Sequence, residues 1–69
     1  MNAGEVAEAH AVLLGQTEEL ERAFNRFDKA LREGQSPEHR REAWYVLQHA
    51  HHHLEGAFWS WFRAREAER

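Results

Sequence analysis

The 69-residue sequence contains no cysteine, one proline and four glycines. Without cysteine, the chain can form no disulfide and offers no thiolate nucleophile or thiolate metal ligand. The scattered glycines form no glycine-rich phosphate-binding loop. No apolar run approaches the roughly 20 residues of a membrane-spanning helix, and the first residues lack a signal-peptide pattern. We therefore expect a cytoplasmic protein that has no membrane contact.

Basic side chains are also scarce. The chain has 9 Lys and Arg against 12 Asp and Glu, which gives a net charge of −3 with the histidines neutral. Proteins that hold nucleic acid through its phosphates need a positive surface, so nucleic-acid binding is not favoured. The second half contains Ser60, but no acid and histidine are spaced around it as in a catalytic triad. We expect no catalytic activity.

Large apolar residues and alanines recur every seven residues in both halves of the sequence. The large column consists of Val6, Leu13, Leu20 and Phe27, and then of Leu47, Leu54 and Trp61. The alanine column consists of Ala9, Ala23 and Ala30, and then of Ala43, Ala50, Ala57 and Ala64. Such a repeat is typical of helices that pack along a seam of large and small residues. It predicts an all-α fold of two helices that pack closely as an antiparallel pair.

Turn and capping residues predict where these helices begin and end. Gly34 suits a left-handed residue after a helix, and Ser36 followed by Pro37 suits an N-cap and a first helical position. We expect one domain over residues 1–69, with a helix over about 3–33, a turn at 34–36 and a second helix over about 37–65. Gly15 could interrupt the first helix, although the heptad phase continues through it.

A third column beside the alanines leaves more apolar surface than a two-helix hairpin can bury. Its members are His10, Thr17, Phe24 and Leu31, and then Trp44, His51, Phe58 and Arg65. An exposed apolar patch of this kind marks an interface. The pattern predicts a homodimer of hairpins that forms a four-helix bundle. This layout resembles the Rop family of small RNA-binding helical-hairpin dimers, which also alternate small and large core residues; the resemblance concerns architecture, and no RNA-contact residue is carried over.

The predicted interaction residues fall into two sets. The predicted dimer core comprises Leu13, Leu20, Phe24, Phe27, Trp44, Leu47, Leu54, Phe58 and Trp61. A second set, Tyr45, His52, Trp59 and Phe62, lies on the expected outward face of the second helix. Exposed aromatic side chains in a row are typical of a surface that binds a partner protein.

Six histidines are many for 69 residues, and four of them fall between His49 and His53. His49 and His53 stand four residues apart, as do His51 and Glu55, and this spacing allows two side chains on a helix to share one metal ion. The candidate ligands are therefore His49, His51, His53 and Glu55, and imidazole suits zinc, nickel or copper. The alternative is that His51 is a buried polar residue that fixes the helix register, with the other histidines on the surface.

The sequence as a whole predicts a small non-catalytic interaction or regulatory module. It would act as a homodimeric bundle and bind a macromolecular partner through an exposed helix face, without a cofactor. A metal- or cofactor-binding bundle that uses the histidine cluster remains an alternative. Nucleic-acid binding in the Rop manner is another, although the first helix offers only four basic residues, interleaved with acids: Arg22, Arg26, Lys29 and Arg32.

Overall fold

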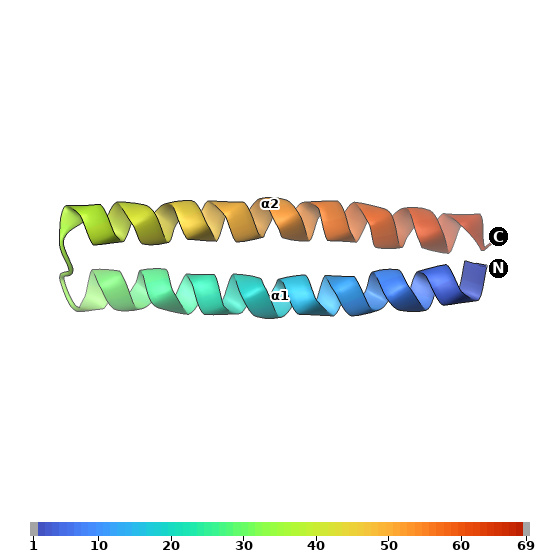
Figure 1. Ribbon diagram of the computed structural model, residues 1–69, viewed down its shortest axis with the longest axis horizontal. Coiled ribbons are helices and arrows are strands. Elements are labelled where there is room, and N and C mark those ends of the chain that lie inside the picture. The colour runs from blue at the N-terminus through green and yellow to red at the C-terminus, as the bar shows by residue number, and fades with distance from the viewer. Residues whose placement is uncertain (1, 69) are drawn as a thin grey trace.

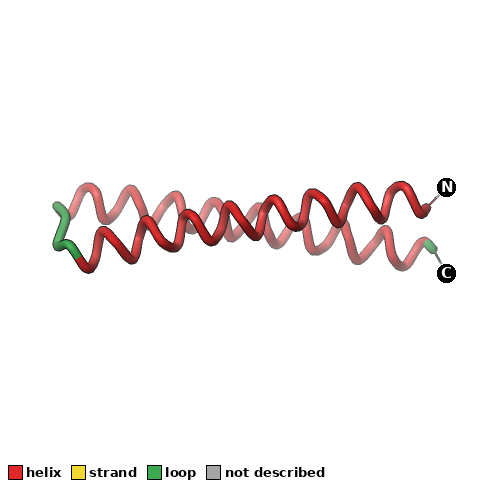
Figure 2. The backbone as a smooth tube through the Cα atoms, turned by 90° about the horizontal axis from the view of Figure 1, so that it is seen from below, coloured by secondary structure: helices red, strands yellow, loops and turns green. Residues whose placement is uncertain are grey.

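The computed structural model describes residues 2–68, with the side chains of residues 4–68. Two helices make up the fold, α1 (Asn2–Arg32) and α2 (Pro37–Ala67), and no strand occurs in this range. The helices run antiparallel and lie side by side, so that both ends of the chain are at the end opposite the turn (Figure 1). Seen from the edge, the two helices cross at a shallow angle (Figure 2). The prediction of an all-α antiparallel hairpin is confirmed.

The helix boundaries differ from the predicted ones by a few residues. α1 ends at Arg32, because Glu33 and Gly34 already form the turn, and α2 continues two residues beyond the expected end at Arg65. Gly15 does not interrupt α1. The heptad pattern continues through Gly15, and a helix that stays in phase keeps its apolar column on the neighbouring helix.

Backbone hydrogen bonds close the end of α1. Gly34 has a φ of 60°, and its amide donates to the carbonyl of Leu31, while the amide of Gln35 donates to that of Ala30. These two bonds form a Schellman motif, in which the left-handed residue is normally glycine. The Ser36 hydroxyl then accepts a hydrogen bond from the His39 amide at 3.2 Å, and Pro37 begins α2.

Alanine is the commonest buried residue at the interface between the two helices. The buried apolar residues are Val6, Leu13, Ala23, Ala30, Ala43, Ala50, Leu54 and Ala57. Leu13, Leu54 and Ala57 form a cluster against which Leu20 and Trp61 pack. Because alanine projects little beyond the backbone, it allows the helices to approach closely, while the large column fills one side of the seam.

The hairpin is long and thin. It measures 50 × 13 × 11 Å, and no large side chain among the described residues is fully buried. Residues 2–68 form no third element that could cover the sides of the seam, so many large apolar residues stay exposed. Neither helix, over the described residues, is long and apolar enough to cross a membrane.

Candidate functional site

One side of the hairpin carries what we call the aromatic face. Its exposed members are Phe24, Leu31, Trp44 and Phe58, and its half-buried members are Leu20, Phe27, Leu47 and Trp61. Phe24 is 55% exposed, Phe58 49% and Trp44 45%. The face extends over both helices: the rings of Phe27 and Trp44 lie 5.4 Å apart across the seam. Apolar area of this extent is unusual on the free surface of a soluble monomer.

The predicted dimer core divides into residues that the hairpin buries by itself and residues that it leaves open. Leu13 and Leu54 are 9% exposed, so the chain covers them without a second copy. Leu20, Phe27, Leu47 and Trp61 are half-buried at the edge of the seam. Only Phe24, Trp44 and Phe58 depend on something outside the chain for their burial. The sequence did not separate these groups, because the separation depends on how far each helix is rotated toward the other.

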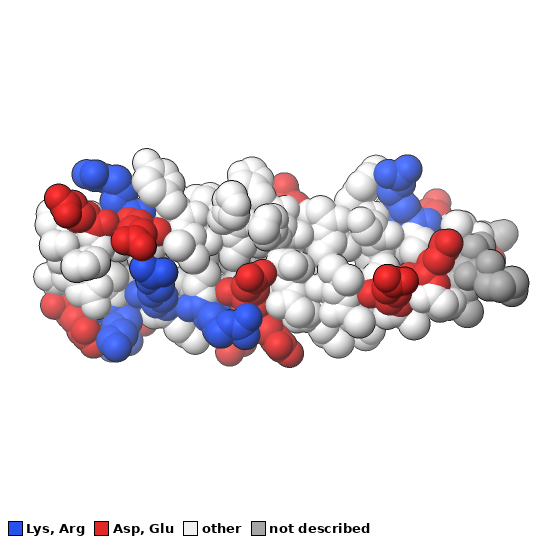
Figure 3. Space-filling model, in the orientation of Figure 1, with Lys and Arg blue, Asp and Glu red and all other residues white. Residues whose placement is uncertain are grey.

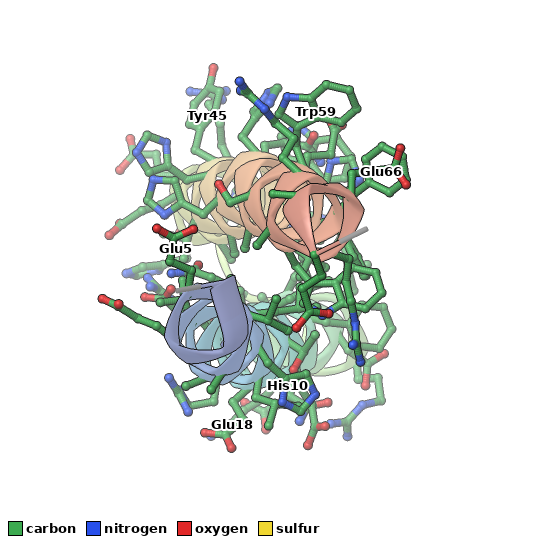
Figure 4. The ribbon with its side chains drawn as sticks, turned by 90° about the vertical axis from the view of Figure 1, so that its right-hand side faces the viewer. Glu5, His10, Glu18, Tyr45, Trp59 and Glu66 are labelled. Atoms are coloured by element: carbon green, nitrogen blue, oxygen red, sulfur yellow. The ribbon has the colours of Figure 1, made fainter. Side chains whose placement is uncertain are left out.

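A second apolar surface lies on the side of α2 that points away from α1. We call it the outer surface and define it by Tyr45, His52 and Trp59. Tyr45 and Trp59 are 63% and 59% exposed, and both project away from α1 in Figure 4. Their spacing of two heptads places them on one line along the helix.

Phe62, the fourth predicted partner residue, connects the outer surface to the aromatic face. Its ring stacks on that of Trp59 with centroids 5.7 Å apart and an interplanar angle of 29°. The same ring lines a small apolar pocket with Phe58, Trp59 and Trp61. The two surfaces therefore meet near the C-terminal end of α2.

The four predicted metal ligands do not gather at one place. The rings of His49 and His53 lie 5.0 Å apart and line a groove on the alanine side of the seam. Glu55 instead lines the pocket beside Phe58, and the ring of the exposed His51 lies 6.2 Å from that of His52. Among residues 4–68, no three His, Asp or Glu side chains come close enough to hold a metal ion. The expectation of a buried His51 is also not met within one chain.

The groove on the alanine side, which we call the alanine groove, has charged residues as well as Tyr45 and Val46 in its lining. Ala23 and Ala50 lie in it, with charged residues of both helices around them. Arg26 and Glu42 form an ion pair of 3.3 Å across the seam, with side chains 50% and 65% exposed. In Figure 3, acidic and basic side chains alternate over the turn half of this side. Such an alternation gives no continuous positive stripe for a nucleic acid.

Two polar features lie on the alanine side of the seam, and the hydrogen bonding of neither was predicted. The ion pair between Arg26 and Glu42 links the helices, and both residues flank the alanine column, which is the signal that could have revealed it. Gln16 occupies an alanine position, and its buried side-chain oxygen finds no hydrogen-bond partner among the described residues. The sequence shows that an amide interrupts the alanine column at Gln16. It does not show which hydrogen bonds this amide makes, because these depend on the rotamer of the Gln16 side chain.

Comparison with known proteins provides no family for this chain: no protein-family model, no curated protein and no solved structure matches it.

Proposed function

We propose that this chain is a small non-catalytic interaction module that works as a homodimer. The aromatic faces of two copies pack together into a four-helix bundle, and the outer surface of α2 remains free to bind a partner protein. The observation that carries this proposal is the exposed apolar area on two separate sides of the hairpin, which residues 2–68 leave uncovered.

The extent of the exposed surface supports a second copy on the aromatic face. The hairpin exposes 5343 Å², whereas a compact monomeric protein of its 8.2 kDa exposes about 4,500 Å². The excess of about 800 Å² equals the area that each partner contributes to a standard protein interface. A second copy is a suitable occupant, because two-fold dimers are the commonest oligomers and a flat two-helix layer completes a four-helix bundle when it is doubled.

The charges also favour this use of the two sides. Phe24, Leu31, Trp44 and Phe58 are apolar, and Arg65, which continues their row, lies over the Trp61 ring with its charge paired to Glu68. Acidic and basic residues occupy the alanine groove on the opposite side. A buried interface avoids unpaired charges, because each one loses its hydration. The alanine groove therefore suits solvent, and the aromatic face suits burial.

Two neighbouring residues provide the test of the dimer. Phe58→Glu places a charge on the aromatic face, and Trp59→Glu places the same charge on the outer surface, at a residue of similar exposure. We expect Phe58→Glu to sediment as a monomer and Trp59→Glu to remain a dimer, with circular dichroism reporting the helix content of both. A Phe58→Glu protein that is still a dimer, or a Trp59→Glu protein that is not, would contradict the proposed arrangement.

The same pair separates dimerisation from partner binding. Proteins captured by the wild-type dimer should be lost with the dimeric Trp59→Glu variant, because aromatic side chains supply much of the binding energy of protein interfaces. Glu18→Lys is the control, since Glu18 projects from α1 on the side away from α2 (Figure 4). If a captured protein binds Trp59→Glu as well as it binds the wild type, the outer surface is not its binding site.

Metal binding is the second candidate, and the contact between the rings of His49 and His53 favours it. Two imidazoles one helical turn apart can hold one zinc, nickel or copper ion. Zinc sites in proteins have three or four protein ligands, and among the described side chains no third ligand joins these two. Metal binding therefore remains the alternative to the interaction module, and a fixed mass excess in the native protein would establish it.

A further inference from the structure

We infer that the two copies of the dimer lie with their turns at the same end of the bundle, and that the dimer therefore presents its two outer surfaces on opposite sides. This inference rests on the proposed dimer and specifies its geometry. The functional consequence is that one dimer joins two partner molecules.

The register of the hairpin is the starting point. Arg26 forms its ion pair with Glu42, and Phe27 contacts Trp44, so residues at equal distances from the turn are neighbours across the seam. The two helices have 31 residues each. Every position on α1 thus has a position on α2 at the same height.

Only two two-fold arrangements pack the aromatic faces together. When the turns are at the same end, α1 of each copy lies on α2 of the other, and residues at equal distances from the turn meet. When the turns are at opposite ends, α1 lies on α1 and α2 on α2. Residues near the turn of one copy then meet residues near the chain ends of the other. The residues that border the face distinguish the two arrangements.

The charges at the edge of the face favour turns at the same end. Asp28 lies four residues before Arg32, the last residue of α1, and Arg41 lies four residues after Pro37, the first residue of α2. Asp28 therefore meets the partner's Arg41. One Asp28 oxygen accepts a bond from Arg32 at 2.8 Å, and the other is available to a second guanidinium. With the turns at opposite ends, Arg41 instead lies at the height of the partner's Arg63, four residues before the end of α2, which has the same charge.

Polar groups at the centre of the face agree with the charges. Thr17 and His51 stand at the middle of their helices, and the Thr17 hydroxyl donates its single proton to the carbonyl of Leu14 at 2.7 Å. It can still accept a hydrogen bond. With the turns together, it meets a ring nitrogen of the partner's His51, which can donate. With the turns apart, Thr17 meets the partner's Thr17, and neither hydroxyl has a proton left to give.

The outer surfaces then take up opposite positions. Tyr45 and Trp59 point away from α1 within one copy (Figure 4). Turns at the same end place the two α2 helices at diagonal corners of the bundle, so the two outer surfaces point in opposite directions. In the other arrangement the two α2 helices are adjacent, and their outer surfaces form one continuous surface on one side.

A distance between spin labels tests this inference, because the chain contains no cysteine that would also be labelled. Glu33→Cys places one label at the exposed turn of each copy. Turns at the same end give a separation under about 30 Å, set by the width of a four-helix bundle. Turns at opposite ends give about 45 Å or more, the length of a 31-residue helix.

Glu18→Cys is the matched control, since its label lies near the middle of α1 and gives a short distance in either arrangement. A short distance for both variants supports the inference. A short distance for Glu18→Cys with a long one for Glu33→Cys overturns it and leaves the dimer intact. No measurable coupling in either variant means that the proposed dimer itself has failed.

Discussion

At the scale of single residues, the seam depends on a difference in size between alanine and leucine. The alanines permit close approach of the two backbones, and the few large buried side chains then provide most of the apolar area. Leu13 and Leu54 are each 9% exposed and belong to one cluster. Because so few large side chains are buried, truncating one of them removes a large share of the buried apolar area.

Leu54→Ala is therefore expected to lower the free energy of unfolding by about 2–4 kcal/mol, from lost apolar transfer and the cavity that remains. Val12→Ala is the control, since Val12 is 51% exposed, and it should change that free energy by less than about 0.5 kcal/mol. Urea denaturation at matched protein concentration measures both. A change of under about 0.5 kcal/mol for Leu54→Ala would show that the heptad columns are assigned to the wrong face.

Individual residues also show where sequence reasoning was incomplete. The spacing of His49 and His53 correctly indicated that their rings are neighbours. The second predicted pair, His51 and Glu55, lies elsewhere: Glu55 lines the pocket beside Phe58, whereas His49 and His53 line the alanine groove. Residues four apart share a helix face, but residues two apart lie on nearly opposite faces, so the two pairs cannot form one site within a single helix.

At the scale of the elements, local backbone chemistry determines where each helix ends. Gly34 has a positive φ, and Ser36 and Pro37 begin α2. These features were predictable, because each residue type has a specific conformational or hydrogen-bonding reason to be there. The exact ends of α1 at Arg32 and of α2 at Ala67 could not be predicted, because helix termini depend on small differences between competing hydrogen bonds.

Two glycines should respond in opposite ways to the same substitution. Gly34→Ala is expected to destabilise the protein by about 1 kcal/mol, because alanine is strained at a φ of 60°. Gly15→Ala should stabilise it by about 1 kcal/mol, because Gly15 lies inside α1. An added Cβ has no neighbour within 4 Å at either position, so packing contributes to neither result. Thermal denaturation measures both, and a shift of the same sign in the two variants would contradict this account of the turn.

At the scale of the whole molecule, the hairpin leaves the two sides of its seam with different characters. The heptad columns predicted the antiparallel pair and the presence of surplus apolar surface. They could not specify which of the large residues the two helices would bury. Leu54 and Phe58 both belong to apolar columns, and their different angles around α2 decide that Leu54 is buried and Phe58 is exposed. These angles depend on the packing of one helix against the other, and no local pattern contains them.

The central claim is that the aromatic face belongs to an interface between two copies. Native mass spectrometry of untagged protein that has never been in contact with nickel tests it most directly. The account predicts twice the chain mass of 8.2 kDa with no metal attached. A dimer with a fixed number of metal ions would support the two-histidine alternative, and a folded 8.2 kDa monomer at micromolar concentration would contradict the claim.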